Sequence, residues 1–201
     1  MSNGNNNGNP GKPAGNGGNG NGAHSSHLDD TAANHPTQAS PQPPLEVRIG
    51  QVMRDRGLSV CAAESCTGGL ILHRLTNVPG SSAYVMGGFV TYSNEAKVKF
   101  ARVSKKTLMR HGAVSEETAL EMAMGVRAAF GTDLALSVTG IAGPGGGTDH
   151  KPVGLTYIAL GSPSGERVVR YVWTGDRESN KQQSAEAALK LLYDYLTSSS
   201  R

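Results

Sequence analysis

Short apolar runs alternate with helical patterns through residues 45–201, and this alternation limits the folds open to the chain. The runs "LSVCAA", "YVMGGFVTY" and "LALSVTGIA" have the length of buried strands and are bounded by turn residues. Strands that alternate with helices are typical of α/β layered domains with a mainly parallel sheet. The runs "VGLTYIALG" and "RVVRYVWTG", joined by "SPSGE", predict a closing antiparallel hairpin. We therefore predict a mixed, mainly parallel sheet.

The clearest helical pattern is "SEETALEMAMGVRAAFG". Ser115 is a suitable N-cap, Glu116 favours the first turn, and Gly131 ends the pattern. Further helices are predicted over 45–56 and 178–196. The predicted buried face of the clearest helix consists of Ala119, Met122, Val126, Ala129 and Phe130.

The first 44 residues differ in composition from the rest of the chain. They contain nine Asn, eight Gly and only two large apolar residues, Met1 and Leu28. Such a segment cannot bury enough apolar surface to offset the entropy lost on ordering. We predict a disordered tail over residues 1–44 and a single domain over residues 45–201. The tail also lacks the charged start and apolar middle of a secretory signal.

The charge of the domain is too small and too scattered to predict a nucleic-acid partner. The tail holds one Lys and two Asp, so residues 45–201 carry 18 basic and 14 acidic residues. No stretch approaches the ~18 apolar residues of a membrane span. Cys61 and Cys66 fit neither a disulfide framework nor a zinc site. We expect a cytoplasmic protein with no nucleic-acid or membrane partner, whose net charge suits an anionic small molecule.

Three polar clusters follow predicted strands, and open α/β sheets bind ligands at the carboxyl ends of strands. The first is "ESCTGG", residues 64–69. Free backbone N–H groups and the positive end of a helix there could hold a phosphate or an oxyanion. Ser65 is a candidate nucleophile; alternatively, Ser65 or Thr67 only caps the helix. The segment is not a Walker loop and does not match "GxSxG".

The second cluster is "TYSNEAK", with Tyr92 at a strand end and Lys97 five residues later. A lysine can act as a base for serine if its surroundings lower its pKa; otherwise Lys97 is a surface lysine. The third cluster is "TGIAGPGGGTDHKP", where Thr139 ends a strand and backbone donors could face a bulky ligand. This segment could equally be a plain surface loop. Arg177 in "TGDR" could clamp a phosphate or simply face solvent.

A serine–histidine pair from distant segments is an open alternative that nothing in the sequence favours. His73 lies about two turns down the helix that follows Ser65. His111 adjoins the helix-ending Gly112, and His150 lies in the glycine-rich loop.

Seven blocks in one order resemble the C-terminal domain family of CinA, the competence- and damage-inducible protein. The resemblance implies a three-layer α/β/α sandwich with a mixed sheet, a homodimer, and no metal or cofactor. It implies a nicotinamide-nucleotide amidohydrolase, which converts nicotinamide mononucleotide to nicotinic acid mononucleotide and ammonia. Longer family members carry an additional N-terminal domain, and we expect a stand-alone form here. The blocks are "AESCTGGL", "VPGSS", "GGFVTYSNEAK", "HGAVSEETA", "VTGIAGPGGGT", "KPVGLTYIAL" and "GDR", which cover essentially all of residues 45–201.

The resemblance assigns catalytic roles to Ser65, Lys97 and Tyr92. Ser65 matches the family's nucleophile, and Lys97 matches its base. Lys97 in its neutral form would take the proton from Ser65, directly or through Tyr92. A Cys66 nucleophile is the alternative, although we expect Cys66 only to pack.

The residues expected to bind substrate supply backbone donors, polar contacts or positive charge. The substrate would be a pyridine mononucleotide. The alternative function is a non-catalytic module that binds pyridine nucleotides or a partner and is linked to competence or DNA damage. The expected binding residues are Cys66, Thr67, Gly68, Thr139, Gly140 and Arg177.

Overall fold

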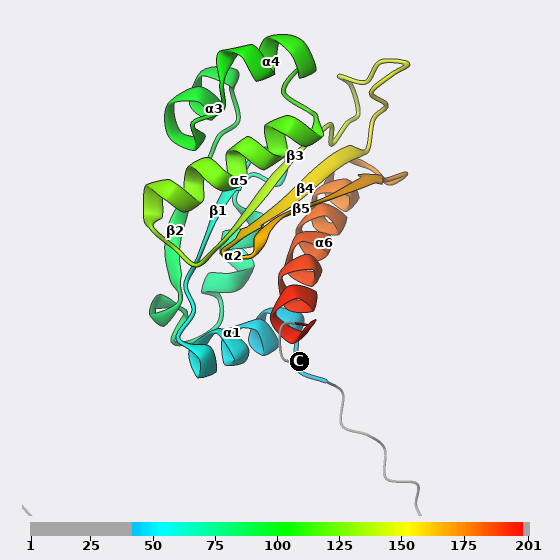
Figure 1. Cartoon of the computed structure of the whole chain (residues 1–201). Helices are drawn as coiled ribbons and strands as arrows, with labels where there is room; N and C mark the ends of the chain where they lie inside the picture. The colour runs from blue at the N-terminus through cyan, green and yellow to red at the C-terminus, as the bar shows by residue number, and fades with distance from the viewer. Residues whose placement is uncertain (1–41, 199–201) are drawn as a thin grey trace, which may run out of the picture. The chain divides into compact units, whose positions relative to one another are not determined.

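The central feature of the structure is a five-stranded sheet in the order β2-β1-β3-β4-β5. This computed structural model describes residues 42–198 (Figure 1). Strands β2, β1 and β3 run parallel, whereas the β3–β4 and β4–β5 pairs are antiparallel. The predicted mixed α/β sheet is confirmed. The bounds are β1 Val60–Glu64, β2 Val85–Val90, β3 Leu134–Gly140, β4 Leu155–Ser162 and β5 Gly165–Val172.

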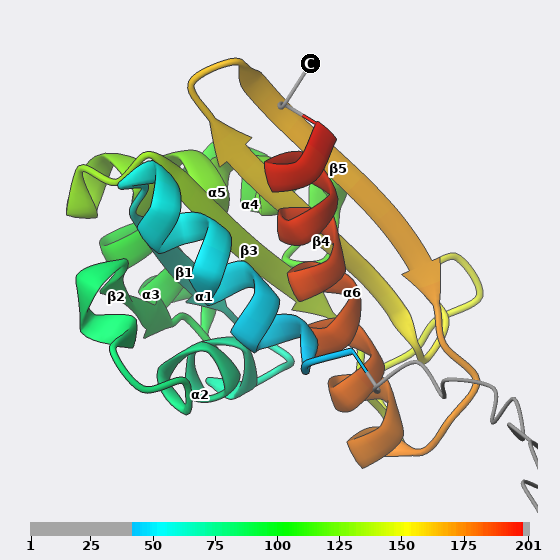
Figure 2. The ribbon, with the colours of Figure 1, turned by 90° about the horizontal axis from the view of Figure 1, so that it is seen from below.

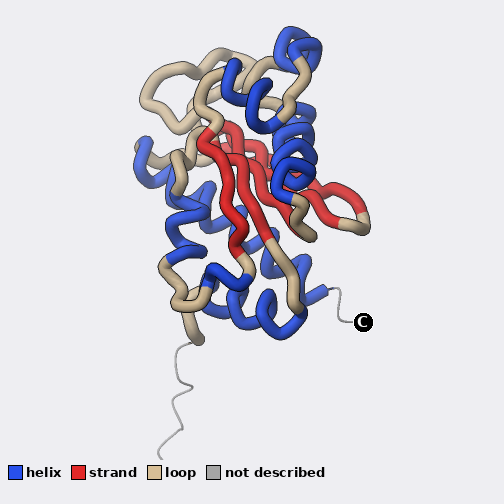
Figure 3. The backbone as a smooth tube through the Cα atoms, turned by 90° about the vertical axis from the view of Figure 1, so that its left-hand side faces the viewer, coloured by secondary structure: helices blue, strands red, loops and turns tan. Residues whose placement is uncertain are grey.

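Helices cover both faces of the sheet, so the predicted three-layer sandwich is confirmed (Figures 1 and 2). Helices α1, α2 and α6 share one core cluster with β1, β3 and β4. Helices α3 and α5 share a second cluster on the other face, and α4 packs against α5. Figure 3 shows the strands enclosed between the two helical layers. The bounds are α1 Leu45–Arg56, α2 Leu70–Thr76, α3 Asn94–Ala101, α4 Lys105–His111, α5 Glu116–Phe130 and α6 Arg177–Ser198.

The predicted tail falls almost wholly outside the described residues. Residues 1–41 are not described, so their disorder stays a prediction. Among residues 42–198, no helix is both long and apolar enough to cross a membrane.

Helix ends follow the sequence signals closely. The Ser104 and Ser115 hydroxyls accept hydrogen bonds from the N–H groups of Thr107 and Thr118, as N-caps do. Gly131 ends α5 with a left-handed φ of 64°.

The predicted buried face of α5 was wrong at one position, Ala129, which is exposed. Ala119, Met122 and Val126 are fully buried, and Phe130 is partly buried against the same core. Burial extends instead to Gly125 because α3 packs closely against α5 there. A Cβ at Gly125 would lie 1.8 Å from the Ala101 carbonyl oxygen.

We predict that Gly125→Ala destabilises the domain by about 1–3 kcal/mol, because the added methyl group meets backbone that cannot move cheaply. Urea unfolding followed by circular dichroism measures this change. The matched control is Gly145→Ala, where a Cβ meets no atom within 4 Å. Equal stability of the two variants would contradict the close approach of α3 and α5.

Candidate active site

The three polar clusters meet at one edge of the sheet, where the parallel strands β1, β2 and β3 end. In the registers of these strands, Glu64 pairs with both Val90 and Val138, so the three strands end side by side. A pocket of about 160 Å³ lies at this edge. Seven of the predicted site residues line it: Ser65, Cys66, Tyr92, Lys97, Thr139, Gly140 and Arg177.

The shortest contact between two chemically active side chains in the pocket joins Lys97 and Ser65. Lys97 Nζ lies 2.9 Å from Ser65 Oγ, and the two residues are 1% and 7% exposed. The same amine donates to the carbonyl oxygen of Thr91 at 2.7 Å and to that of Tyr92 at 3.4 Å. Ser93 caps α3 and thereby starts the helix that carries Lys97. The structure therefore brings the predicted nucleophile and base into direct contact.

Burial changes the chemistry of the Lys97 amine. Loss of solvation lowers the pKa of Lys97 from 10.5 to about 8. A neutral amine has two N–H groups and one lone pair. The two N–H groups match the carbonyl oxygens of Thr91 and Tyr92, which leaves the lone pair for the Ser65 hydroxyl proton. The surroundings therefore suit the form of lysine that can act as a base.

Three amide N–H groups at the start of α2 are already occupied, contrary to our expectation that this turn holds a phosphate or an oxyanion. The Glu64 carboxylate accepts hydrogen bonds from the N–H groups of Gly69 at 2.9 Å, Ile71 at 3.2 Å and Leu72 at 2.9 Å. Sequence reasoning missed this role of Glu64. The available signal was an acidic residue at the end of a strand that is otherwise apolar.

Of the N–H groups of residues 66–68, that of Cys66 remains as the candidate oxyanion donor, because Cys66 lines the pocket. The Gly68 N–H donates to the Ser65 carbonyl oxygen, and Gly68 is exposed and does not line the pocket. The N–H groups of Cys66 and Thr67 lie against the Cys66 sulfur. Among residues 42–198, no backbone carbonyl accepts from either group. A thiol is a weak acceptor, so the Cys66 N–H at the pocket could still be shared with a ligand oxygen.

The Thr67 side chain does not reach the pocket. Thr67 is 1% exposed, and its hydroxyl is buried without a hydrogen-bond partner in the described part of the chain. The structure therefore places Thr67 behind the turn, and any contact with substrate would be made through its N–H group.

Tyr92 and Arg177 contact each other at the pocket, 85 positions apart in the sequence. Arg177 Nη2 donates to the Tyr92 hydroxyl at 3.1 Å, and Nη1 donates to the Gly143 carbonyl oxygen at 2.7 Å. Tyr92 is 63% exposed. A proton relay through the Tyr92 phenol is thus not what the structure shows, because Lys97 contacts Ser65 directly. Tyr92 instead supplies a main-chain acceptor to Lys97 and a hydroxyl to Arg177.

Thr139, Gly140 and Cys66 form the inner wall. The Thr139 hydroxyl donates to the Ala113 carbonyl oxygen at 2.6 Å. A Cβ at Gly140 would lie 2.8 Å from the Leu155 carbonyl oxygen and 3.0 Å from the Cys66 sulfur, so a larger residue would not fit there. Burial raises the pKa of Cys66 to about 12, which keeps the thiol protonated and makes it a poor nucleophile.

None of the described histidines lines the pocket. His73 contacts Asn77 within the next turn of its own helix, and His111 pairs with Glu117. The structure therefore offers no serine–histidine pair with Ser65. Within residues 42–198, no three His, Cys, Asp or Glu side chains gather as metal ligands would.

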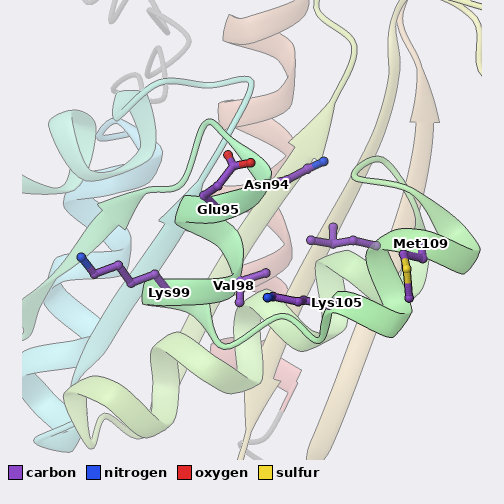
Figure 4. Close-up of a pocket in the computed structure, with 7 residues that line it drawn as sticks. Asn94, Glu95, Val98, Lys99, Lys105 and Met109 are labelled. Carbon is purple, nitrogen blue, oxygen red and sulfur yellow. The ribbon is translucent and has the colours of Figure 1, made fainter.

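A larger pocket lies between α3 and α4 (Figure 4). It has a volume of about 620 Å³ and is lined mainly by the apolar parts of Val98, Leu108 and Met109, with Lys99 and Lys105 beside them. No serine or cysteine lines it. Size alone therefore does not identify the reactive site in this protein.

Comparison with known proteins gives one family. The model of the CinA C-terminal domain matches residues 42–196. A CinA-like protein from Chloroherpeton thalassium is 55% identical over 162 residues, which are 78% of this chain and 38% of that protein. A putative competence-damage inducible protein from Moorella thermoacetica is 53% identical over 149 residues, 74% of this chain and 36% of that protein. The chain thus spans little more than a third of these curated relatives.

Solved structures share the fold over most of their length. A CinA superfamily protein from Klebsiella pneumoniae matches with a TM-score of 0.74 and 35% identity, covering 76% of this chain and 96% of that one. The competence/damage inducible protein CihA from Agrobacterium tumefaciens matches with a TM-score of 0.70 and 41% identity, covering 79% and 99%.

We predict that the stability of the wild type rises with pH relative to that of Lys97→Met. The unfolded chain holds the Lys97 proton up to pH 10.5 and the folded chain only to about pH 8. Stability therefore increases between these values, and the penalty for burying the charged amine is fully present below pH 8. Between about pH 8 and pH 10.5, the free energy of unfolding of the wild type should rise by up to about 3 kcal/mol relative to that of Lys97→Met. Urea unfolding at pH 7 to 10 measures the difference.

The control for this measurement is Lys99→Met, which removes an exposed lysine from the same helix. The difference in stability between this variant and the wild type should stay nearly constant over the same pH range. A constant difference for Lys97→Met as well would contradict a lowered pKa at Lys97.

Proposed function

The chain belongs to the CinA C-terminal domain family, and on this premise we propose that it is a nicotinamide-nucleotide amidase. It would hydrolyse the linear amide of nicotinamide mononucleotide to give nicotinic acid mononucleotide and ammonia. The observation that carries the proposal is the 2.9 Å contact between the buried Lys97 amine and the Ser65 hydroxyl. A serine activated by a neutral lysine is a nucleophile suited to acyl transfer.

In the first step, Ser65 Oγ attacks the carboxamide carbon as its proton passes to the lone pair of Lys97. The electrons of the C=O bond move to the amide oxygen, which becomes an oxyanion. The N–H group of Cys66, which lines the pocket and is not bound by a backbone carbonyl oxygen, is the candidate donor to stabilise it. One such donor typically contributes roughly 3–4 kcal/mol to the transition state.

In the second half, the charged Lys97 returns its proton to the leaving nitrogen. The C–N bond breaks, ammonia departs, and an ester links Ser65 to the nicotinoyl group. Neutral Lys97 then takes a proton from water as the water oxygen attacks the ester carbon. The bond from that carbon to Ser65 Oγ breaks, Lys97 returns the proton to Ser65 Oγ, and the acid departs. The carbonyl oxygens of Thr91 and Tyr92 hold the amine in place during both transfers.

The shape and charge of the site support an anionic substrate that is only partly enclosed. The pocket of about 160 Å³ is small, so it would hold the carboxamide end of the substrate while the ribose phosphate extends outside. Arg177 lines the pocket and is itself exposed, and two of its five N–H donors are used within the protein. The remaining donors could bind a phosphate. Because this anchoring positions the amide, free nicotinamide should be a poor substrate.

We predict that Ser65→Ala lowers ammonia release from nicotinamide mononucleotide by at least about 1,000-fold, because no nucleophile remains. The matched control is Cys66→Ala, which removes the neighbouring thiol and should retain activity within about tenfold. A coupled ammonia assay on the purified protein measures both. Unchanged turnover in Ser65→Ala would contradict the proposal. Binding of the mononucleotide by the wild type without ammonia release would instead support a non-catalytic binding module.

We also predict that kcat/KM rises with pH and levels off above an apparent pKa of about 8. Only the neutral amine accepts the Ser65 proton, and burial lowers the pKa of Lys97 to about 8. Initial rates between pH 6 and 9.5, at substrate concentrations well below KM, measure the profile. Activity that falls with rising pH over this range would rule out Lys97 as the base.

A further inference from the structure

We propose that the Glu64 side chain is a positioning residue for Ser65, because it closes the turn that carries the nucleophile. The inference rests on the proposed role of Ser65. It adds a residue that does not line the pocket and that acts only through Ser65.

The Glu64 carboxylate joins the two ends of a short loop. Residues 65–68 lie between the end of β1 and the first amide groups of α2. The carboxylate reaches across them to the N–H groups of Gly69, Ile71 and Leu72 at 2.9–3.2 Å. Inside this closed loop, the Gly68 N–H donates to the Ser65 carbonyl oxygen at 3.2 Å. Ser65 is therefore the first residue of a turn that is held at both ends.

This arrangement does more than a helix cap requires. A short polar residue at the N-cap usually satisfies the first amide groups of a helix. Here the N-cap is Gly69, with no side-chain cap, and the acceptor comes from the preceding strand. Glu64 is fully buried, and its carboxylate accepts hydrogen bonds from three main-chain N–H groups. Among residues 42–198 it forms no ion pair. A Ser, Thr or Asn side chain at the N-cap would satisfy an amide group of the helix without burying a carboxyl group.

The main chain of Glu64 is tied to the segment that holds the base. The Glu64 carbonyl oxygen accepts a hydrogen bond from the Thr91 N–H at 2.7 Å. The Thr91 carbonyl oxygen in turn accepts from Lys97 Nζ at 2.7 Å. These two hydrogen bonds connect the Glu64 main chain to the Lys97 amine, so the position of Glu64 affects where the Ser65 turn lies relative to that amine. A movement of the turn would change the Ser65–Lys97 distance without removing either group.

Glu64→Gln tests the carboxylate with little change in volume. The glutamine amide keeps one oxygen but places an NH₂ group against an N–H donor, so at least one of the three hydrogen bonds is lost. A misplacement of about 1 Å can lower a rate by roughly 100-fold. We expect kcat to fall about 10- to 100-fold, with KM within about twofold of the wild type. The apparent pKa of the pH profile should stay near that of the wild type, because Lys97 itself is unchanged.

The control variant is Asp133→Asn at the opposite end of β1. Asp133 accepts hydrogen bonds from the Ser59 N–H at 2.8 Å and from the Ser59 hydroxyl at 2.7 Å. This variant also loses a carboxylate that joins two segments, but far along the strand from Ser65. Its kcat per folded molecule should match that of the wild type. The inference would be overturned if Glu64→Gln kept the wild-type kcat, or if its kcat fell by the same factor as that of Asp133→Asn.

A second readout separates this inference from the proposed function. The rate at which a fluorophosphonate labels Ser65, followed by mass spectrometry, reports the reactivity of the serine without an amide substrate. Labelling of the wild type and Asp133→Asn, with at least tenfold slower labelling of Glu64→Gln, supports the role of Glu64 even if ammonia release is absent. Equal labelling rates would overturn the role of Glu64 while leaving the proposed function in place. Failure of the wild type to label would count against both.

Glu64→Asp serves if the glutamine variant does not fold. It keeps the charge but shortens the side chain by one methylene group, so the carboxylate cannot reach all three amide groups. We expect labelling to be slowed several-fold, between the rates of the wild type and Glu64→Gln. A folded Glu64→Asp protein that labels at the wild-type rate would overturn the inference.

Discussion

The buried amine of Lys97 is the interaction on which the rest of the site depends. A lysine that is 1% exposed is tolerated because it can lose its proton and because main-chain carbonyl oxygens receive its N–H groups. Both of these acceptors belong to the β2–α3 junction, so the base is fixed largely by backbone. In the neutral form of Lys97, the remaining lone pair would face the Ser65 hydroxyl. The proposed activation of Ser65 therefore rests on burial and geometry and requires no third side chain.

The sheet topology explains how two residues 32 positions apart meet at this distance. Parallel strands end at the same edge, and β1 and β2 are neighbours in the sheet. The turn after β1 carries Ser65, and the first turn of the helix after β2 carries Lys97. On the other side of β1, β3 contributes Thr139 and Gly140 to the same pocket. The antiparallel hairpin of β4 and β5 extends the sheet without disturbing this edge.

Much of the fold could be predicted from the sequence because its signals are local. The serine cap of α5, the glycine that ends α5 and the apolar runs of the strands each act within a few residues. The pairing of Ser65 with Lys97 was predicted from the resemblance to the CinA C-terminal domain family, because the residues alone left Lys97 open as a surface lysine. The hydrogen-bond partners of polar side chains could not be predicted from the sequence. Arg177 donates to the Tyr92 hydroxyl, 85 positions away, and the Glu64 carboxylate accepts from amide groups at the start of α2.

The most direct test of this account is the ionisation of Lys97 itself. An NMR titration of the side-chain Cε and Nζ signals, assigned by comparison with Lys97→Met, measures it without substrate. The account predicts a midpoint near pH 8, well below the ordinary lysine value of 10.5. A midpoint near 10.5 would leave the amine almost wholly charged at pH 8, where about half of it should be neutral, and would contradict Lys97 as the acceptor of the Ser65 proton.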